Sequence, residues 1–181
     1  EHAESSLGHV YVIWGGQTLP STMLLPVSSI QQGCYFRGTM SSISCGIGNL
    51  ITAGDFNGDG HDDLIFTTSQ FAVFVVFASN TVKWALNMTS FPKSVRLYNF
   101  NILPRSIATG DINGDAIDDV FLGEPHFSSD NGQVIIWFGS VSPSNLNIDS
   151  TSKPDGITWS RINGGIAKAQ FGHSIGIVHS H

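Results

Sequence analysis

The sequence predicts an all-β fold built from repeated units of four antiparallel strands. Short runs rich in Val, Ile and Phe alternate with clusters of Gly, Asn, Ser and Pro, which is typical of a chain with many short strands. One sixteen-residue pattern occurs twice, at residues 51–66 and 107–122, and an apolar run that ends on an aromatic residue occurs three times, at residues 9–14, 71–77 and 133–138. Both patterns recur about every sixty residues, which indicates a repeat architecture.

Each unit divides into four strands in chain order. The first strand enters an acidic loop and the second leaves it, at residues 49–54 and 63–67 in one unit and at residues 106–110 and 119–122 in the next. The third strand is the apolar run, and the fourth is weaker in sequence. The expected fourth strands are residues 34–39, 82–86 and 156–162. Four strands joined by short loops describe a blade of the β-propeller type. The alternative, a solenoid, is less compatible with two strands that flank a tight loop as a hairpin.

This division yields two full blades and a partial blade at each end of a single propeller segment. The expected boundaries are residues 1–44 for a partial blade, residues 45–100 and 101–165 for the full blades, and residues 166–181 for the start of the next blade. A propeller ring has about four to eight blades. We therefore expect that either a longer protein or neighbouring chains complete the open blades.

Composition and charge restrict the class of protein. Hydrophobic residues make up 41% of the 181 residues and charged residues 12%, and a low charge content with 20 Gly favours a β-rich extracellular or assembling protein. The net charge of −6 corresponds to six of the 14 acidic residues, which stand at the candidate ligand positions of the two loops, because the other acids balance the 8 Lys and Arg. Without a basic patch or an apolar run of about 20 residues, we expect neither nucleic-acid binding nor direct membrane insertion. We expect an extracellular or cell-surface location.

The two acidic loops carry the candidate chemistry of the chain. Side-chain oxygens stand at loop positions 1, 3, 5 and 9, and the carbonyl of position 7 is a further candidate ligand. An oxygen-only set with three carboxylates selects calcium, so we expect two calcium ions as cofactors. The expected ligands are Asp55, Asn57, Asp59, His61 and Asp63 in the first loop, and Asp111, Asn113, Asp115, Ile117 and Asp119 in the second. The alternative, solvated turns without an ion, is disfavoured by two copies with the same ligand positions.

Two further positions define the kind of loop. An EF-hand needs an acid at position 12, where this chain has Phe66 and Leu122 inside expected strands, so the loop is of a shorter, nine-residue kind. Position 6 is Gly60 in the first loop and Ala116 in the second. If this position needs a positive φ, Ala costs about 1 kcal/mol there, and we expect the second site to bind more weakly or to have a different shape.

These residues resemble the FG-GAP repeat. The resemblance rests on GDFNGDGHDDLIF at residues 54–66, on the apolar-aromatic strand after it and on the pair Phe171-Gly172, and at blade level it covers nearly the whole chain. The family includes the propeller of integrin α subunits. The resemblance implies one calcium ion between the first and second strands of each blade, on one rim of the propeller, held by the loop residues named above. The chain departs from the family pattern at Cys45-Gly46 before the first loop, at Ile102-Leu103-Pro104 before the second, and at Gly123-Glu124-Pro125 after it.

Candidates for covalent modification are few. Cys34 and Cys45, the two cysteines of the chain, are either a disulfide of a secreted protein or two buried free thiols. Asn87 begins the one Asn-x-Ser/Thr acceptor for glycosylation in the sequence. We expect the disulfide and the glycosylation if the protein is secreted.

The remaining motifs point less clearly to a site. His173, His179 and His181 could hold zinc, but they also fit the end of an unfinished blade. The four Trp residues are either sugar-stacking platforms or core: Trp14, Trp84, Trp137 and Trp159. No nucleophile motif, phosphate loop or close pair of unliganded carboxylates stands out, so we expect no catalytic residue.

We therefore expect a non-enzymatic, extracellular, calcium-binding propeller module for adhesion, ligand binding or the building of a surface or filament assembly, with calcium in a structural role. Its expected partners are other protein chains that pair with the terminal segments at residues 8–16 and 171–181, and an extracellular protein or glycan ligand. Two alternatives stay open: an accessory propeller domain of a secreted hydrolase or lyase, and a carbohydrate-binding propeller.

Overall fold

The protein is almost entirely β-structure in its computed structural model. The structure describes residues 8–13, 33–37, 46–69, 72–78, 85–87, 94–98, 104–141, 147–149 and 159–178. Within these residues it has 12 strands and one helix of 4 residues, α1 (Phe127–Asp130). The predicted all-β fold class is confirmed. None of the described helical structure has the length and apolar character that a membrane span requires.

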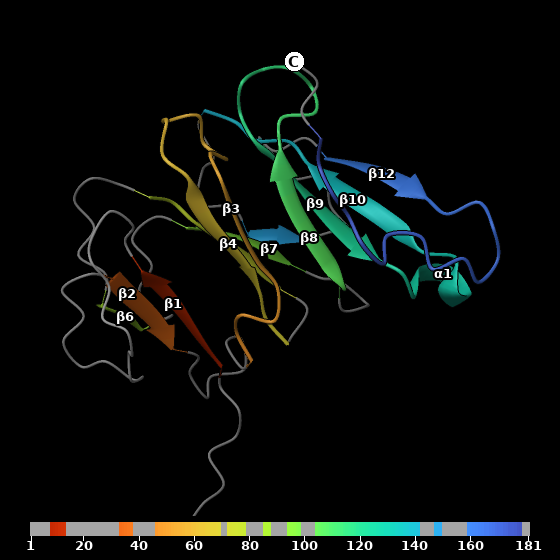
Figure 1. Cartoon of the computed structure of the whole chain (residues 1–181), viewed down its shortest axis with the longest axis horizontal. Helices are drawn as coiled ribbons and strands as arrows, with labels where there is room; N and C mark the ends of the chain where they lie inside the picture. Colours follow the sequence, from red (N-terminus) through yellow and green to blue (C-terminus); the bar gives the residue numbers. More distant parts are fainter. Residues whose placement is uncertain are drawn as a thin grey trace, which may run out of the picture.

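The strands form three sheets that lie next to one another like segments of a fan (Figure 1). The first sheet contains β1 (His9–Ile13), β2 (Gly33–Arg37) and β6 (Ala85–Asn87). The second contains β3 (Ile51–Gly54), β4 (Asp63–Thr67), β5 (Val73–Val76), β7 (Ser94–Tyr98) and β11 (Asn147–Asp149). The third contains β8 (Ser106–Gly110), β9 (Asp119–Glu124), β10 (Gln133–Trp137) and β12 (Trp159–Asn163).

The first three strands of each unit form an antiparallel meander, as the sequence predicts. β3 pairs with β4 and β8 with β9, and in both hairpins a glycine lies opposite the first aspartate of the second strand: Gly54 opposite Asp63, and Gly110 opposite Asp119. β5 and β10 continue the two sheets as third strands. The innermost strands of neighbouring sheets meet at Thr52 and Thr109, whose hydroxyl oxygens are 3.1 Å apart. Each hairpin therefore holds its acidic loop at the same edge of adjacent sheets.

The predicted fourth strand at residues 82–86 is wrong. The strand in this region, β6, pairs in parallel with β2 of the first sheet, and β7 takes the fourth position of the second sheet by pairing antiparallel with β5. The next unit has the same strand arrangement. β11 pairs in parallel with β7 of the second sheet, and β12 pairs with β10 as the fourth strand of the third sheet, as predicted. The connections from β5 to β7 and from β10 to β12 thus each add a short strand to the preceding sheet. Strand propensity cannot show this, because it does not identify the partner strand.

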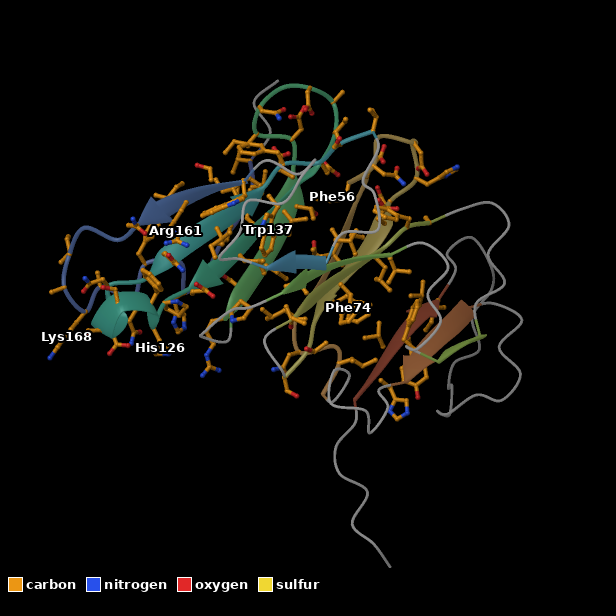
Figure 2. All side chains as sticks on the ribbon, turned by 180° about the vertical axis from the view of Figure 1, so that it is seen from behind. Phe56, Phe74, His126, Trp137, Arg161 and Lys168 are labelled. Carbon is orange, nitrogen blue, oxygen red and sulfur yellow. The ribbon has the colours of Figure 1, made fainter. Side chains whose placement is uncertain are left out.

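Both faces of the second sheet are buried against its neighbours. Along β4, Ile65 faces the third sheet and Phe66 faces the first, which is the alternation that a strand produces. Between the second and third sheets lie Phe56, Ile65, Val73, Val75, Phe77, Val120, Leu122, Ile135 and Trp137 (Figure 2). Between the first and second lie Val10, Phe36, Ile47, Phe66, Ala72, Phe74 and Val76. The apolar content is therefore used in contacts between sheets.

The pair Phe171-Gly172 has its counterpart at Ile47-Gly48, so the predicted counterpart Cys45-Gly46 is wrong. Gly48 and Gly172 have nearly the same positive φ, 86° and 85°. A Cβ would lie 2.8 Å from Val10 Cγ2 at Gly48, and 3.2 Å from Val134 Cγ2 at Gly172. Val10 and Val134 are the second residues of two third strands, so each pair begins a new unit by packing against the preceding sheet. Glycine is needed there because the backbone is left-handed and approaches closely.

The expected first strand of a further blade, at residues 171–181, is not formed in the part of this segment that the structure describes. Residues 172–178 belong to no strand, and Phe171 makes a single bridge to Gly132. Ile175 and Ile177 pack on the outer face of the third sheet, against Phe121, Val134 and Ile136. The segment covers the sheet as a following unit would.

We expect the Phe66→Ala substitution to destabilise the protein by about 3–5 kcal/mol, because it removes a buried aromatic side chain from between two sheets. Phe66 is 0% exposed, and its ring lies 5.9 Å from Phe36 and 5.7 Å from Phe74 between centroids. Its partner in the β3–β4 register, Ile51, is 50% exposed, so Ile51→Ala is the matched control with an effect within about 0.5 kcal/mol. Urea unfolding measures both, and equal losses would contradict the packing described.

Candidate functional site

The two acidic loops lie at the same edge of the second and third sheets, between β3 and β4 and between β8 and β9 (Figure 1). We call residues 55–63 the first loop and residues 111–119 the second loop. In each, apolar residues before and after the loop pair in the hairpin, while the polar residues turn around a glycine with positive φ, Gly58 at 69° and Gly114 at 79°. The hairpin ladder therefore brings the ends of each loop together, and the loop positions its polar side chains.

In the first loop, the side chains at positions 1, 3 and 5 accept hydrogen bonds from the backbone of the same loop. Asp55 Oδ2 accepts from the Gly60 N–H at 2.8 Å, and Asp59 Oδ1 accepts from the His61 N–H at 2.9 Å. The Asp59 N–H is shared between Asp55 Oδ1 and Asn57 Oδ1. The Asn57 amide in turn donates to Asp59 Oδ2 at 3.1 Å. Three of the predicted ligands are thus brought together around the loop backbone.

The second loop repeats this arrangement. Asp111 Oδ2 accepts from the Ala116 N–H at 2.8 Å, and Asp115 Oδ1 accepts from the Ile117 N–H at 2.9 Å. Asn113 donates to Asp115 Oδ2 at 3.0 Å and accepts from the Asp115 N–H at 3.0 Å. The same contacts occur in two loops with different residues at positions 2, 6 and 7, so the shared Asp-x-Asn-Gly-Asp pattern at positions 1 to 5 determines the loop shape.

Position 6 has a positive φ in both loops, 83° at Gly60 and 66° at Ala116. Ala116 therefore has the left-handed backbone conformation that is predicted to be energetically costly for alanine. A Cβ at Gly60 would meet nothing within 4 Å, so the cost of alanine at this position is conformational and not steric.

The last predicted side-chain ligand of each loop is buried beneath it. Asp63 and Asp119 are both 0% exposed, and each accepts an N–H from the residues after the third strand, Ala78 at 2.8 Å and Gly139 at 3.0 Å. In the second loop, Asp119 Oδ2 also accepts from the Ile112 N–H at 3.0 Å. These two carboxylates therefore connect the hairpins to the third strands.

The first loop differs from the second at this buried carboxylate. The Phe56 N–H, which corresponds to that of Ile112, donates instead to the Gly54 carbonyl at 3.0 Å. Asp63 Oδ2 consequently has no hydrogen-bond donor although it is buried. A buried carboxylate oxygen without a partner is energetically costly, so this atom requires a proton, a water or a cation.

Burial also changes the acidity of these groups. Burial is the main cause that raises the pKa of Asp63 from 3.8 to about 7; the negative charges of Asp59 and Asp55 contribute to this rise, and the backbone N–H groups of Ala78 and Phe56 oppose it. Burial likewise raises the pKa of Asp119. The backbone N–H of Ala116 is the main cause that lowers the pKa of Asp111. Each loop therefore combines a buried carboxylate that resists ionisation with exposed acids around it.

The donor set fits a hard divalent cation. Every predicted side-chain ligand offers carboxylate or amide oxygen, and Asp63 Oδ2 is a buried acceptor that lacks a donor. In the part of the chain that the structure describes, no three His, Cys, Asp or Glu side chains already converge as a metal site. Binding would therefore require loop carboxylates to replace contacts with their own backbone by contacts with the ion.

Asp118 in the second loop is a further site residue that the ligand pattern of the sequence does not predict. The Asp55 N–H donates to Asp118 Oδ2 at 3.0 Å, and the Asp118 N–H donates to the Asp55 carbonyl at 2.9 Å. Asp118 thus joins the second loop to the first residue of the first loop. The acidic doublets Asp62-Asp63 and Asp118-Asp119 could have drawn attention to this position, but only the packing of adjacent sheets identifies its partner.

The other candidate residues lie away from the loops or outside the described residues. Cys34 lies opposite Val12 in the β1–β2 register, while Cys45 is outside the described residues, so the disulfide stays a prediction. Asn87 ends β6, and its glycosylation also stays a prediction. His173 is exposed, and His179 and His181 fall outside the described residues.

Two of the four tryptophans can be placed. Trp137 is buried in the core at 3% exposure, so it is not a platform for a sugar. The guanidinium of Arg161, which is labelled in Figure 2, lies over the ring of Trp159, 5.3 Å from its centroid, and also over the ring of Phe127, the first residue of α1. Trp14 and Trp84 lie outside the described residues.

The comparison with protein families agrees with this geometry. A family model described as the FG-GAP repeat matches residues 48–79 and residues 103–137. The first match contains β3 to β5 and the second β8 to β10, so each includes one acidic loop with its hairpin and third strand. The predicted FG-GAP resemblance is therefore confirmed for both repeats. No curated protein matches the chain significantly.

We expect opposite effects from exchanging the residues at position 6. Gly60→Ala places a Cβ on a left-handed residue and should destabilise the protein by about 1 kcal/mol, whereas Ala116→Gly relieves this strain and should be neutral or stabilising by up to about 1 kcal/mol. Urea unfolding in calcium-free buffer measures both changes. If both variants lose the same unfolding free energy, backbone strain at position 6 does not differ between Gly60 and Ala116.

We expect the calcium-free protein to lose stability as the pH rises through about 7, because of Asp63. Its folded pKa of about 7 lies above the ordinary 3.8, so the folded state keeps a proton that the unfolded state has released. This contribution is complete below pH 3.8 and is lost as the pH rises through the folded pKa. Denaturant unfolding from pH 5 to 8, with chelator, compares the native protein with Asp63→Asn. If the unfolding free energies of the two proteins change with pH in the same way, Asp63 does not cause the expected loss of stability.

Proposed function

The chain contains two FG-GAP repeats, and from this premise we propose that it is a non-enzymatic, propeller-type module that binds two calcium ions in a structural role, outside the cell or at its surface. It would serve adhesion, ligand binding or the building of a larger protein assembly. The observation that carries the proposal is Asp63 Oδ2, a fully buried carboxylate oxygen without a hydrogen-bond donor beneath a loop of further carboxylates.

The role of calcium follows from the elements that the ligands join. In the first loop, Asp55 follows β3, Asn57 and Asp59 form the turn, and Asp63 begins β4 and contacts Ala78, two residues after β5. Bound calcium would supply positive charge to carboxylates that otherwise repel one another and resist burial. The protein residues would then hold the ends of three strands in one arrangement. This chemistry stiffens the edge of a sheet and requires no reaction at the ion.

Two features support a role in assembly. In the second sheet, β11 pairs with the outer edge of the fourth strand, β7. In the third sheet, the corresponding strand β12 pairs with β10, and no described strand pairs with its outer edge. Residues 172–178 cover the third sheet without forming a strand. Exposed strand edges pair with other strands, so we propose that a further repeat, in the same protein or in another chain, completes this side. Sedimentation of the native protein at rising concentration tests for association, and a strictly monomeric protein with no further repeats would contradict it.

The extracellular location rests on composition and on the family. FG-GAP repeats are typical of extracellular or surface proteins, and millimolar calcium outside cells suits a loop of exposed oxygen ligands. The chain has 12% charged residues, which is low for a protein that stays free in solution. Detection of the native protein in the secreted or the intracellular fraction of its source would decide this point.

We expect calcium to raise the stability of the protein through both loops. A ligand present at about 100 times its dissociation constant adds about 2.7 kcal/mol per site when it binds only the folded state. Asp59→Ala and Asp115→Ala should each remove the contribution of one loop. The unfolding free energy with and without calcium measures this. Asp62→Ala is the matched control, because Asp62 is an exposed acid of the first loop outside the alternating ligand positions. A calcium effect that all variants retain, or its absence from the native protein, would contradict the proposal.

A further inference from the structure

We propose that Asp118 is a positioning residue that couples the two calcium loops, so that an ion in one loop raises the affinity of the other. The inference rests on the proposed calcium binding and goes beyond it, because two loops in neighbouring sheets could bind independently. Asp118 is not one of the predicted ligands. It lies between two of them, Ile117 and Asp119, so any ordering of the second loop by an ion also orders Asp118.

The contact between the loops is reciprocal. Asp118 Oδ2 accepts the Asp55 N–H at 3.0 Å, and the Asp118 N–H donates to the Asp55 carbonyl at 2.9 Å. Both backbone groups of Asp55, the first ligand of the first loop, are therefore held by one residue of the second loop. Asp118 is half-buried, so water competes less with this pair of bonds than it would at the loop tips.

Small residues on both sides allow this close approach. A Cβ at Gly54 would lie 2.7 Å from Asp118 Oδ2, and a Cβ at Gly139 would lie 2.5 Å from the Asp118 carbonyl oxygen. Larger residues at these positions would push the two loops apart. The two glycines thus explain how a side chain from one sheet reaches the backbone of the next.

A second connection runs in parallel with the first. The Gly139 N–H donates to the buried ligand Asp119, and the adjacent Ser140 N–H donates to the Phe56 carbonyl in the first loop at 3.0 Å. Phe56 is fully buried among residues of both sheets. The segment that holds Asp119 therefore also holds the residue that follows Asp55, and the contacts between the loops form a continuous network.

Coupling follows from the conformational entropy of this shared segment. An ion in the second loop would restrict residues 117–119 and, through Asp118, the backbone of Asp55. An ion that then enters the first loop has less of its binding segment left to order, so it binds more tightly. Linkage requires the reverse effect to have the same size. A coupling of roughly 5-fold or more in the dissociation constant is the range in which such effects are usually found.

The experiment is a mutant cycle on the full chain, with calcium binding followed by titration calorimetry. Asp115→Ala disables the second loop and reports the first alone, and Asp59→Ala does the reverse. We expect each loop to bind calcium several-fold more weakly when the other is disabled. Asp118→Ala should remove this dependence and leave both loops able to bind. Asp118→Asn, which keeps an acceptor oxygen for the Asp55 N–H, should restore it in large part.

Two additional variants separate coupling from general damage. Asp62→Ala removes the exposed acid at the same position of the first loop and should leave the coupling unchanged. If Asp118→Ala fails to fold, Gly54→Ala tests the same contact, because its Cβ displaces the Asp118 carboxylate. Hydrogen exchange at the Asp55 N–H supplies a reading apart from affinity: it should be slow in the native protein and fast in Asp118→Ala and Gly54→Ala.

The outcomes distinguish this inference from the proposed function. If the native protein binds no calcium, the proposed function fails and the inference fails with it. If both loops bind with affinities that do not depend on each other, or if the dependence survives in Asp118→Ala, the coupling role of Asp118 is overturned while calcium binding stands.

Discussion

A buried carboxylate beneath each acidic loop is the constraint on which the candidate site depends. Asp63 and Asp119 are removed from water, and a charge in such a place is tolerated only when hydrogen bonds, a proton or a cation compensate it. Backbone N–H groups after the third strands supply part of this compensation in both repeats. The exposed acids above them make sense as the remaining ligands of an ion. The same residues thus connect the stability of the sheet to the chemistry of the loop.

The sheets are held together by sharing strands as well as by packing. β6 and β11 each leave their own unit to extend the preceding sheet, and the following strand then returns. Strands such as β4 and β5 bury both faces, one against each neighbouring sheet. A sheet that depends on its neighbours for both its edge and its faces has little stability alone. The stability of such an array is a sum over adjacent units, as in other repeat proteins.

Loops and hairpins were predictable because their determinants are close together in the chain. The alternation of Asp, Asn and Asp positions the ligand oxygens, and the flanking apolar residues form the hairpin ladder. Ala116 has the positive φ that Gly60 has at the same position of the first loop. The sequence does not predict that β6 belongs to the first sheet, because its three residues carry no information about β2, which is about fifty positions away. The sequence predicts Cys45-Gly46 as the family pair before the first loop, but the structure has Ile47-Gly48 in this place, and both pairs have a glycine in the same region. Only the packing against Val10 separates them.

The amino-acid pattern alone therefore established an all-β repeat with two acidic hairpin loops, since strand alternation and loop ligands depend on residues within about ten positions of each other. The tertiary structure decided what depends on distant segments that meet in space. It paired β6 and β11 with preceding sheets. It also placed Asp118 against the backbone of Asp55. These contacts join residues far apart in sequence, and no local periodicity encodes such a distance.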